Sequence, residues 1–320
     1  SSDVCSSDLF SWSLEHLSRL LLRSFAIIGI SEQRLRLSYA WHSFKFMAHF
    51  LTRECEVRRI CTVEEHSKDM TIRLENSFTA STKLNSILHK SIYADETVEI
   101  DRLLGQVVAM KNIQVDRNFS MNFRACLMQI SHMNSLITDL RRFRVPYDAN
   151  STDHEQMLER LWTSLRPGIR RSGRITSEWG EIGFQGHDPA TDFRGMGTLG
   201  LLNLVYFAET HPQAAKAILQ FTNEPGTSRY SYAITGINVT AWAVSFTEAR
   251  VLRDYYYANG ARLKQFHDVY CFLFVAFYEE WKTKNPPDVM SFGIIEKEFL
   301  TKMHNFFASH PRTLPIPSSS

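Results

Sequence analysis

Residues 123–140 read FRACLMQISHMNSLITDL, and apolar side chains return along this stretch every three or four residues. Phe123, Leu127 and Ile130 begin the pattern, and Ile137 and Leu140 continue it. Such a repeat places the apolar residues on one face of an α-helix, whereas a strand would show strict alternation. The stretch therefore predicts a long amphipathic helix that buries one face.

The same helical repeat extends outward along the chain in both directions. It recurs at residues 39–51, 100–108, 157–165, 199–206, 212–219, 230–251, 266–282 and 290–307. Pro212 can open one of these helices, because the first helical position needs no backbone N–H. Alternation typical of strands appears almost nowhere. We predict an all-α fold built as an irregular helical bundle.

The two ends of the chain differ from this pattern. Residues 1–9 read SSDVCSSDL and resemble adapter or assembly sequence rather than native protein. We interpret 1–38 as a non-native or disordered extension and 39–308 as a single helical domain. Residues 309–320 hold three prolines and a serine run, and we expect them to form a disordered tail.

The composition is that of a globular protein. The chain has 320 residues, of which 44% are hydrophobic and 22% charged, and its net charge of +2 does not favour nucleic acid as a partner. Five scattered cysteines predict reduced thiols rather than a disulfide scaffold. No run approaches the ~18 apolar residues of a membrane-spanning helix, and no credible export signal is present. We therefore expect a cytoplasmic protein.

One glycine-rich segment matches a nucleotide-binding pattern in its letters only. Residues 195–200 read GMGTLG, but a polar loop rather than a strand precedes them and a helix follows. We interpret these glycines as small residues that let the start of a helix approach a neighbouring backbone. No Walker A sequence is present, and His154-Glu155 lacks the second histidine of a zinc motif. We predict no metal site and no cofactor of the protein's own.

A basic connection at residues 166–174 carries four arginines, Arg166, Arg170, Arg171 and Arg174. Such a run is most often a solvated loop. It can also form a positive rim that steers an acidic partner, and reversing two of the arginines would then slow association.

Arg194 lies between a loop rich in glycine and proline and a glycine-rich helix start. A long cation with five donors on such a base can be held out from the surface, as an arginine finger must be. From spacing alone, a structural salt bridge remains the more common role of such a residue.

At this point the sequence becomes similar to a known family. Residues 179–197 read WGEIGFQGHDPATDFRGMG and resemble, without a gap, the signature of the ELMO domain, which continues to residue 209. Shorter segments at 55–60, 126–130 and 230–234 resemble the small, stand-alone ELMO-domain-containing (ELMOD) proteins. The resemblance implies a single ELMO domain over 39–308 with its signature loop exposed.

The resemblance implies a GTPase-activating protein for Arf/Arl-type small GTPases, with Arg194 as the catalytic finger. The activator would act on the active site of its partner in membrane trafficking, without a hydrolase site of its own. The partner, in its GTP form, would carry the GTP and Mg²⁺, and a peripheral contact with intracellular membranes is left open. The supporting or partner-binding residues would be Trp179, Gln185, Asp188, Thr191, Asp192, Phe193, Gly195 and Gly197.

Three details of this loop carry further expectations. Asp192 is expected to cap the following helix or brace the arginine, and Gln185 to brace the loop or contact the nucleotide or the switch of the GTPase. His187 and Ala190 depart from the family pattern at the loop tip, which bears on partner preference rather than on the finger.

Two other functions remain open at this stage. Larger ELMO proteins serve as scaffolds that bind exchange factors of Rac-type GTPases, but they carry additional domains that do not fit within 320 residues. A pure effector would bind the GTP-loaded partner without accelerating hydrolysis.

Overall fold

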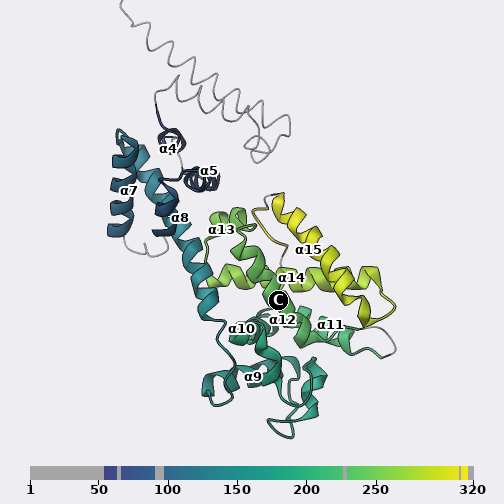
Figure 1. The fold of residues 1–320 in the computed structure, drawn as a ribbon. Helices are drawn as coiled ribbons and strands as arrows, with labels where there is room; N and C mark the ends of the chain where they lie inside the picture. Colours follow the sequence, from purple (N-terminus) through teal and green to yellow (C-terminus); the bar gives the residue numbers. More distant parts are fainter. Residues whose placement is uncertain (1–53, 63–65, 91–96, 226–228, 310, 316–320) are drawn as a thin grey trace, which may run out of the picture. The chain divides into compact units, whose positions relative to one another are not determined.

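A computed structural model describes residues 54–62, 66–90, 97–225, 229–309 and 311–315 (Figure 1). Within these ranges the chain forms helices and no strand, so the predicted all-α fold is confirmed. The predicted extension 1–38 and the apolar stripe at 39–51 lie outside the described residues. None of the described helices combines the length and apolar character that crossing a membrane requires.

The chain separates into two compact units, with the division inside one long helix, α8 (Arg117–Arg142). Among the described residues, unit 1 holds those from 54 to Leu88 and Thr97–Cys126, and unit 2 holds 89–90 and those from Leu127 onward. The sequence interpretation treats 39–308 as one domain. A continuous apolar face along α8 serves both units, so the helical repeat does not mark the boundary between them.

Unit 1 is a small group of helices that bury their aromatic and aliphatic residues together. Its helices are α4 (Glu56–Cys61), α5 (Lys68–Thr79), α6 (Asn85–Lys90), α7 (Thr97–Lys111) and the first part of α8. Phe119 and Phe123 stack one helical turn apart on α8, with ring centroids 5.4 Å apart. The side chain of Asn122 donates to the carbonyl of Cys61 at 3.0 Å, which ties α8 to α4.

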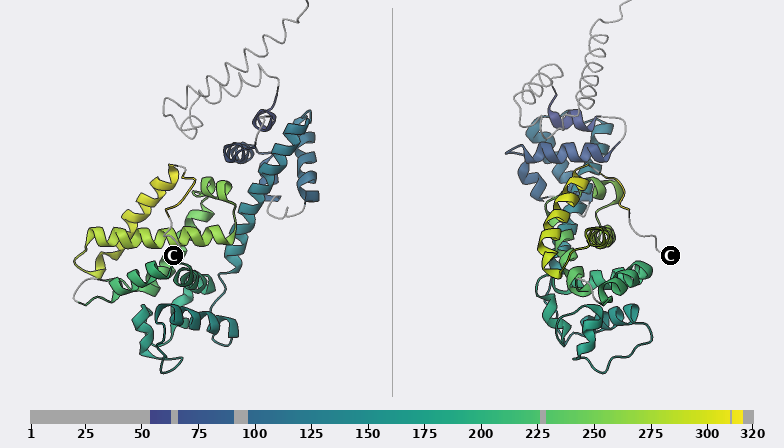
Figure 2. Two further views of the ribbon diagram at one scale, coloured as in Figure 1. Left: turned by 180° about the vertical axis from the view of Figure 1, so that it is seen from behind. Right: turned by 90° about the vertical axis from the view of Figure 1, so that its right-hand side faces the viewer.

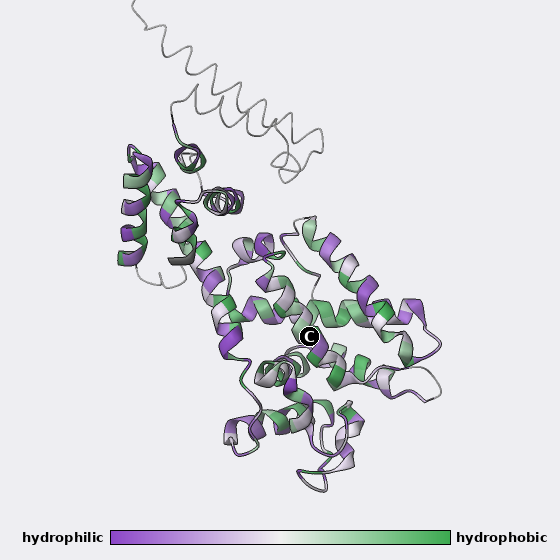
Figure 3. Ribbon diagram, viewed as in Figure 1, coloured by the Kyte–Doolittle hydropathy of each residue, from purple (hydrophilic) through white to green (hydrophobic). Residues whose placement is uncertain are grey.

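Unit 2 is built around helices that are apolar on nearly every side. Its elements after α8 are α9 (Thr152–Leu165), η2 (Ser177–Ile182), η3 (Pro189–Arg194), α10 (Gly197–Thr210), α11 (Pro212–Asn223), α12 (Tyr232–Glu248), α13 (Arg253–Asn259), α14 (Leu263–Lys284), η4 (Val289–Ser291) and α15 (Phe292–Ala308). Hydrophobic colour follows most of α14 in Figure 3, as expected of a helix buried in a core. Pro212 occupies the first turn of α11, as predicted.

A buried polar chain joins the three central helices of unit 2. His267 of α14 contacts the side-chain oxygen of Asn203 on α10 at 2.7 Å, and Asn203 donates to Thr240 on α12 at 3.0 Å. Burial lowers the pKa of His267 to about 4, so the imidazole is neutral at physiological pH. Each of these three buried side chains therefore has a hydrogen-bond partner. The contacts hold α10, α12 and α14 in register with one another.

The segment after α9 lies at one end of unit 2, away from α15, in both views of Figure 2. The sequence predicts an ordered loop over 179–194, and the structure orders it as two short 3₁₀ helices, η2 and η3. Residues 311–315 of the predicted tail belong to unit 2. Leu314 is buried there, and the side chain of Asn259 donates to the carbonyl of Arg312 at 2.7 Å.

Candidate functional site

The aromatic floor of the signature segment is centred on Trp179 in η2. Its indole is fully buried and makes edge contacts with Trp162, at 5.5 Å between ring centroids, and with Phe184, at 5.9 Å. The indole N–H donates to the carbonyl of Arg174 at 2.8 Å. Trp179 therefore supports the signature segment from the protein interior, and its buried side chain is not available to another protein.

Gly183 ends η2 and fastens it to the start of α12. Its φ is +82°, and a Cβ there would come closer than 3.0 Å to the backbone nitrogens of Tyr232 and Ala233. The carbonyl of Gly183 accepts from the N–H of Ile234 at 3.3 Å. Only glycine combines this left-handed backbone with so close an approach.

The η3 helix carries the arginine of interest at its C-terminal end. Asp188 caps the other end, where its carboxylate accepts from the N–H of Ala190 at 3.0 Å, and Pro189 occupies the first turn. Phe193 is buried and stacks on Tyr147 at 5.3 Å between centroids. Arg194 follows directly and is exposed.

Beyond Arg194, the chain is fixed again at the start of α10. The backbone of Gly197 has a φ of +56°, and a Cβ there would press into the carbonyl oxygen of Val145. That same oxygen accepts from the N–H of Thr198 at 2.9 Å. The interpretation of these glycines as residues of close approach is confirmed at Gly197, whereas Gly195 faces open space.

Arg194 makes no hydrogen bond or ion pair with any residue that the structure describes. Its side chain begins between two fixed points, the buried Phe193 ring and the Gly197 turn. The salt bridge that sequence statistics favour for such an arginine is thus absent among the described residues. The guanidinium is exposed, and its donors make no hydrogen bond with the described residues, although its charge attracts the carboxylate of Asp192.

Asp192 braces the loop, although it does so differently from the expectation. Its carboxylate accepts from the backbone N–H of Gln185 at 2.8 Å. Burial raises the pKa of Asp192, opposed by this hydrogen bond and by the positive charge of Arg194. The expected cap of α10 is wrong, since the N-cap is Met196 and no side chain caps that helix.

The remaining predicted residues have local roles or are exposed. The hydroxyl of Thr191 donates to the carbonyl of Asp188 at 2.9 Å, within η3 itself. Gln185 contributes its backbone to the bond with Asp192, while its side chain is exposed. The site therefore consists of one exposed cation and a set of residues that hold its base in place.

The basic connection at 166–174 does not form the predicted positive rim. Arg166 pairs with Glu181, Arg171 with Glu159, and Arg174 with both Glu155 and Asp188. The guanidinium of Arg171 also lies 3.8 Å from the ring centroid of Trp179. Carboxylates from η2, η3 and α9 neutralise three of the four arginines, which leaves Arg170 as the exposed one without a partner among the described residues.

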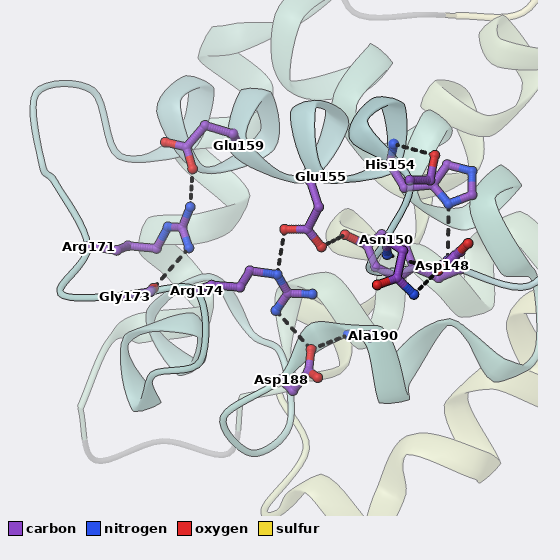
Figure 4. A network of polar contacts seen from close by, with 12 residues as sticks. Asp148, Asn150, His154, Glu155, Glu159, Arg171, Gly173, Arg174, Asp188 and Ala190 are labelled. Carbon is purple, nitrogen blue, oxygen red and sulfur yellow. Dashed lines mark hydrogen bonds and ion pairs between the residues drawn. The ribbon is translucent and has the colours of Figure 1, made fainter.

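Sequence reasoning missed a connected chain of polar contacts that runs from Tyr147 to η3. The hydroxyl of Tyr147 donates to Glu155 at 2.7 Å, Arg174 donates to Glu155 at 2.6 Å, and Arg174 also donates to Asp188 at 2.9 Å. Figure 4 shows Arg174 between the two carboxylates. No sequence spacing marks these residues, because they come from α9 and three separate stretches of loop.

The electrostatics of these polar contacts favour the charged forms of the two carboxylates, Glu155 and Asp188. Burial raises the pKa of Glu155, but hydrogen bonds from Arg174 and Tyr147 outweigh it and the pKa is lowered overall. The pKa of Asp188 is lowered in the same way, with the Ala190 N–H and Arg174 outweighing burial. Both carboxylates are thus ionised at physiological pH and hold Arg174 between them.

Comparison with known proteins places this segment in a named group. The pattern of the ELMO/CED-12 family matches residues 139–296, which include the whole candidate site. ELMO domain-containing protein B of Dictyostelium discoideum is 38% identical over 274 residues, covering 83% of this chain and 94% of the relative. Human ELMO domain-containing protein 2 is 37% identical over 272 residues, covering 82% and 91%. Human ELMO domain-containing protein 1 is 32% identical over 291 residues, covering 82% and 86%.

Proposed function

The chain belongs to the ELMO domain-containing proteins, and on this premise we propose that it is a GTPase-activating protein for small GTPases of the Arf/Arl type. Arg194 is the arginine finger that enters the partner's active site. The observation that carries the proposal is the state of Arg194: it is exposed, it lacks a partner among the described residues, and it sits on a braced turn.

The chemistry of GTP hydrolysis explains why such an arginine is useful. Charge develops on the phosphoryl oxygens and on the leaving oxygen as the γ-phosphate transfers, and a guanidinium placed there stabilises the transition state more than the ground state. Arginine fingers accelerate hydrolysis by roughly 10³ to 10⁵, which corresponds to about 4 to 7 kcal/mol. A guanidinium that must first leave a carboxylate would lose part of that gain.

The neighbouring arginines illustrate this cost. Arg171 and Arg174 are each bound to carboxylates, and Arg171 also stacks on Trp179. Entering another protein would break those contacts. Arg194 has no such contacts with the described residues, so its binding energy is available for the partner.

The proposal assigns the nucleotide and the Mg²⁺ to the partner, which is engaged in its GTP form. The activator works in the cytoplasm, and it contacts intracellular membranes peripherally where the partner is bound to them. The cellular process proposed for it is membrane trafficking.

The experiment is single-turnover GTP hydrolysis by a panel of Arf and Arl proteins, with and without this chain. We expect hydrolysis to accelerate for at least one member of the panel. Binding of a GTP-loaded member without acceleration would overturn the proposal in favour of an effector, and absence of both would exclude the Arf/Arl class.

A further inference from the structure

We infer that Glu155 is a positioning residue that fixes both ends of η3 and thereby aims Arg194. This inference deepens the proposed function and rests on it for its kinetic readout. Glu155 lies on α9, a regular helix of the unit, and its two carboxylate oxygens are used for different purposes.

One oxygen of Glu155 controls the N-terminal end of η3. It accepts from Arg174 Nε at 2.6 Å, and Arg174 Nη1 donates to Asp188 Oδ1 at 2.9 Å. The same Asp188 oxygen accepts from the N–H of Ala190, the bond that caps η3. The cap of this short helix is thus held to α9 through a single guanidinium.

The other oxygen of Glu155 controls the C-terminal end. It accepts from the hydroxyl of Tyr147 at 2.7 Å, and the ring of Tyr147 stacks on Phe193 with an interplanar angle of 21°. Phe193 is the residue directly before Arg194. The backbone at Arg194 is therefore held in place, through Phe193 and Tyr147, by the same carboxylate.

A helix as short as η3 needs such support. Short 3₁₀ segments have poor hydrogen-bond geometry and do not hold their direction alone. A displacement of about 1 Å at a reacting group can cost about 10²-fold in rate. Supporting contacts of this kind act on the rate of the chemical step, because they set the geometry of the bound state rather than the contact area with the partner.

The chain offers a matched control in Glu159, one helical turn further along α9. Glu159 pairs with Arg171, which stacks on Trp179, and no hydrogen bond or ion pair joins Glu159 to η3. Glu155→Gln and Glu159→Gln therefore remove the same charge from the same helix. They differ in whether the lost carboxylate holds the base of Arg194.

The kinetic test compares the two variants at increasing activator concentration, with a GTPase that the wild-type chain activates. We expect Glu155→Gln to lower the maximal rate by about 10-fold or more. The concentration for half-maximal activation, and binding to the partner loaded with a non-hydrolysable GTP analogue, should change less than about twofold. Glu159→Gln should keep the maximal rate within about twofold.

A second readout does not depend on GTPase activation. Amide hydrogen exchange in Glu155→Gln should be faster at residues 190–194 than in wild type, and unchanged in α10 and α12. Tyr147→Phe removes only the hydroxyl and serves as the milder variant if Glu155→Gln does not fold. It should lower the maximal rate in the same direction by a smaller factor.

The outcomes separate the two hypotheses. If the wild-type chain activates a GTPase but the maximal rates of Glu155→Gln and Glu159→Gln agree, Glu155 does not position the finger and the proposed function stands. If the wild-type chain activates no GTPase, the proposed function fails. Unchanged exchange at 190–194 in Glu155→Gln would then also refute the structural part of the inference.

Discussion

Two neighbouring segments of the site use the same residue type in opposite ways. Residues 166–174 carry four arginines, three of which are bound to carboxylates of α9, η2 and η3. Twenty residues after Arg174, Arg194 has no such partner among the described residues. The difference shows that the arginines of the first segment supply rigidity and that Arg194 supplies an available charge, although in the sequence each is simply an arginine outside the helical repeats.

The largest effect expected from this comparison is on catalysis. Replacing Arg194 with Ala should lower the accelerated rate of GTP hydrolysis by roughly 10³-fold or more, and Lys should restore little of it, because an ammonium lacks the planar set of donors. Single-turnover hydrolysis measures the rate, and a thermal melt checks the fold.

Arg170 is the matched control for this substitution, since it is the exposed arginine of the basic connection that lacks a partner among the described residues. Arg170→Ala should leave the maximal rate unchanged and alter association by no more than a few fold. Full activation by a folded Arg194→Ala protein would refute the role of Arg194 as an arginine finger.

The next effect concerns the turn that holds Arg194 from its C-terminal side. Gly197→Ala should destabilise unit 2 by roughly 2 to 4 kcal/mol, because its backbone is left-handed and the added Cβ would press against the carbonyl of Val145. Gly195→Ala should change stability by less than about 0.5 kcal/mol, since its Cβ would face open space. Chemical denaturation measures both, and equal losses would show that the turn at Gly197 is not a fixed point.

A smaller effect tests the structural role of the paired arginines. Arg171→Ala removes the ion pair with Glu159 and the cation–π contact with Trp179, and its side chain is only 10% exposed. We expect a loss of about 1 to 2 kcal/mol in the free energy of unfolding. Arg170→Ala should lose less than about 0.5 kcal/mol. If the two variants were equally stable, the basic connection would be a solvated loop after all.

The smallest effect is a dependence of stability on pH. The pKa values of Glu155 and Asp188 are lowered from their ordinary 4.5 and 3.8, so the unfolded chain binds more protons in this range than the folded one. Their contribution is present above about pH 4.5 and is lost as the pH falls through these values. As the pH is lowered, the free energy of unfolding should therefore fall by about 1 kcal/mol less in Glu155→Gln than in the wild-type protein. Chemical denaturation at a series of acidic pH values measures this difference. An identical slope in both proteins would contradict the role of Glu155 in this network.

The sequence predicted the part of the structure that depends on regular spacing. The helical repeat identifies α7 to α12, α14 and α15 because their apolar residues recur every three or four positions, and Pro212 marks the start of α11. The signature segment located Arg194, and its flanking glycines predicted close backbone contact at the start of α10. The sequence left the basic run as either a solvated loop or a positive rim, because a run of basic residues does not show which carboxylates lie beside it.

What the sequence by itself determined is the class of fold, the family and the identity of the exposed arginine. The family and the arginine depend on the order of residues within one short stretch, and the fold class depends on the helical repeat that recurs along the chain. Only the tertiary structure decided which cations are bound and which is available, because Glu155, Arg174 and Asp188 are brought together by loops that follow no period. Coulomb interactions depend on the distance between two charges in space, and that distance is set only when the helices pack.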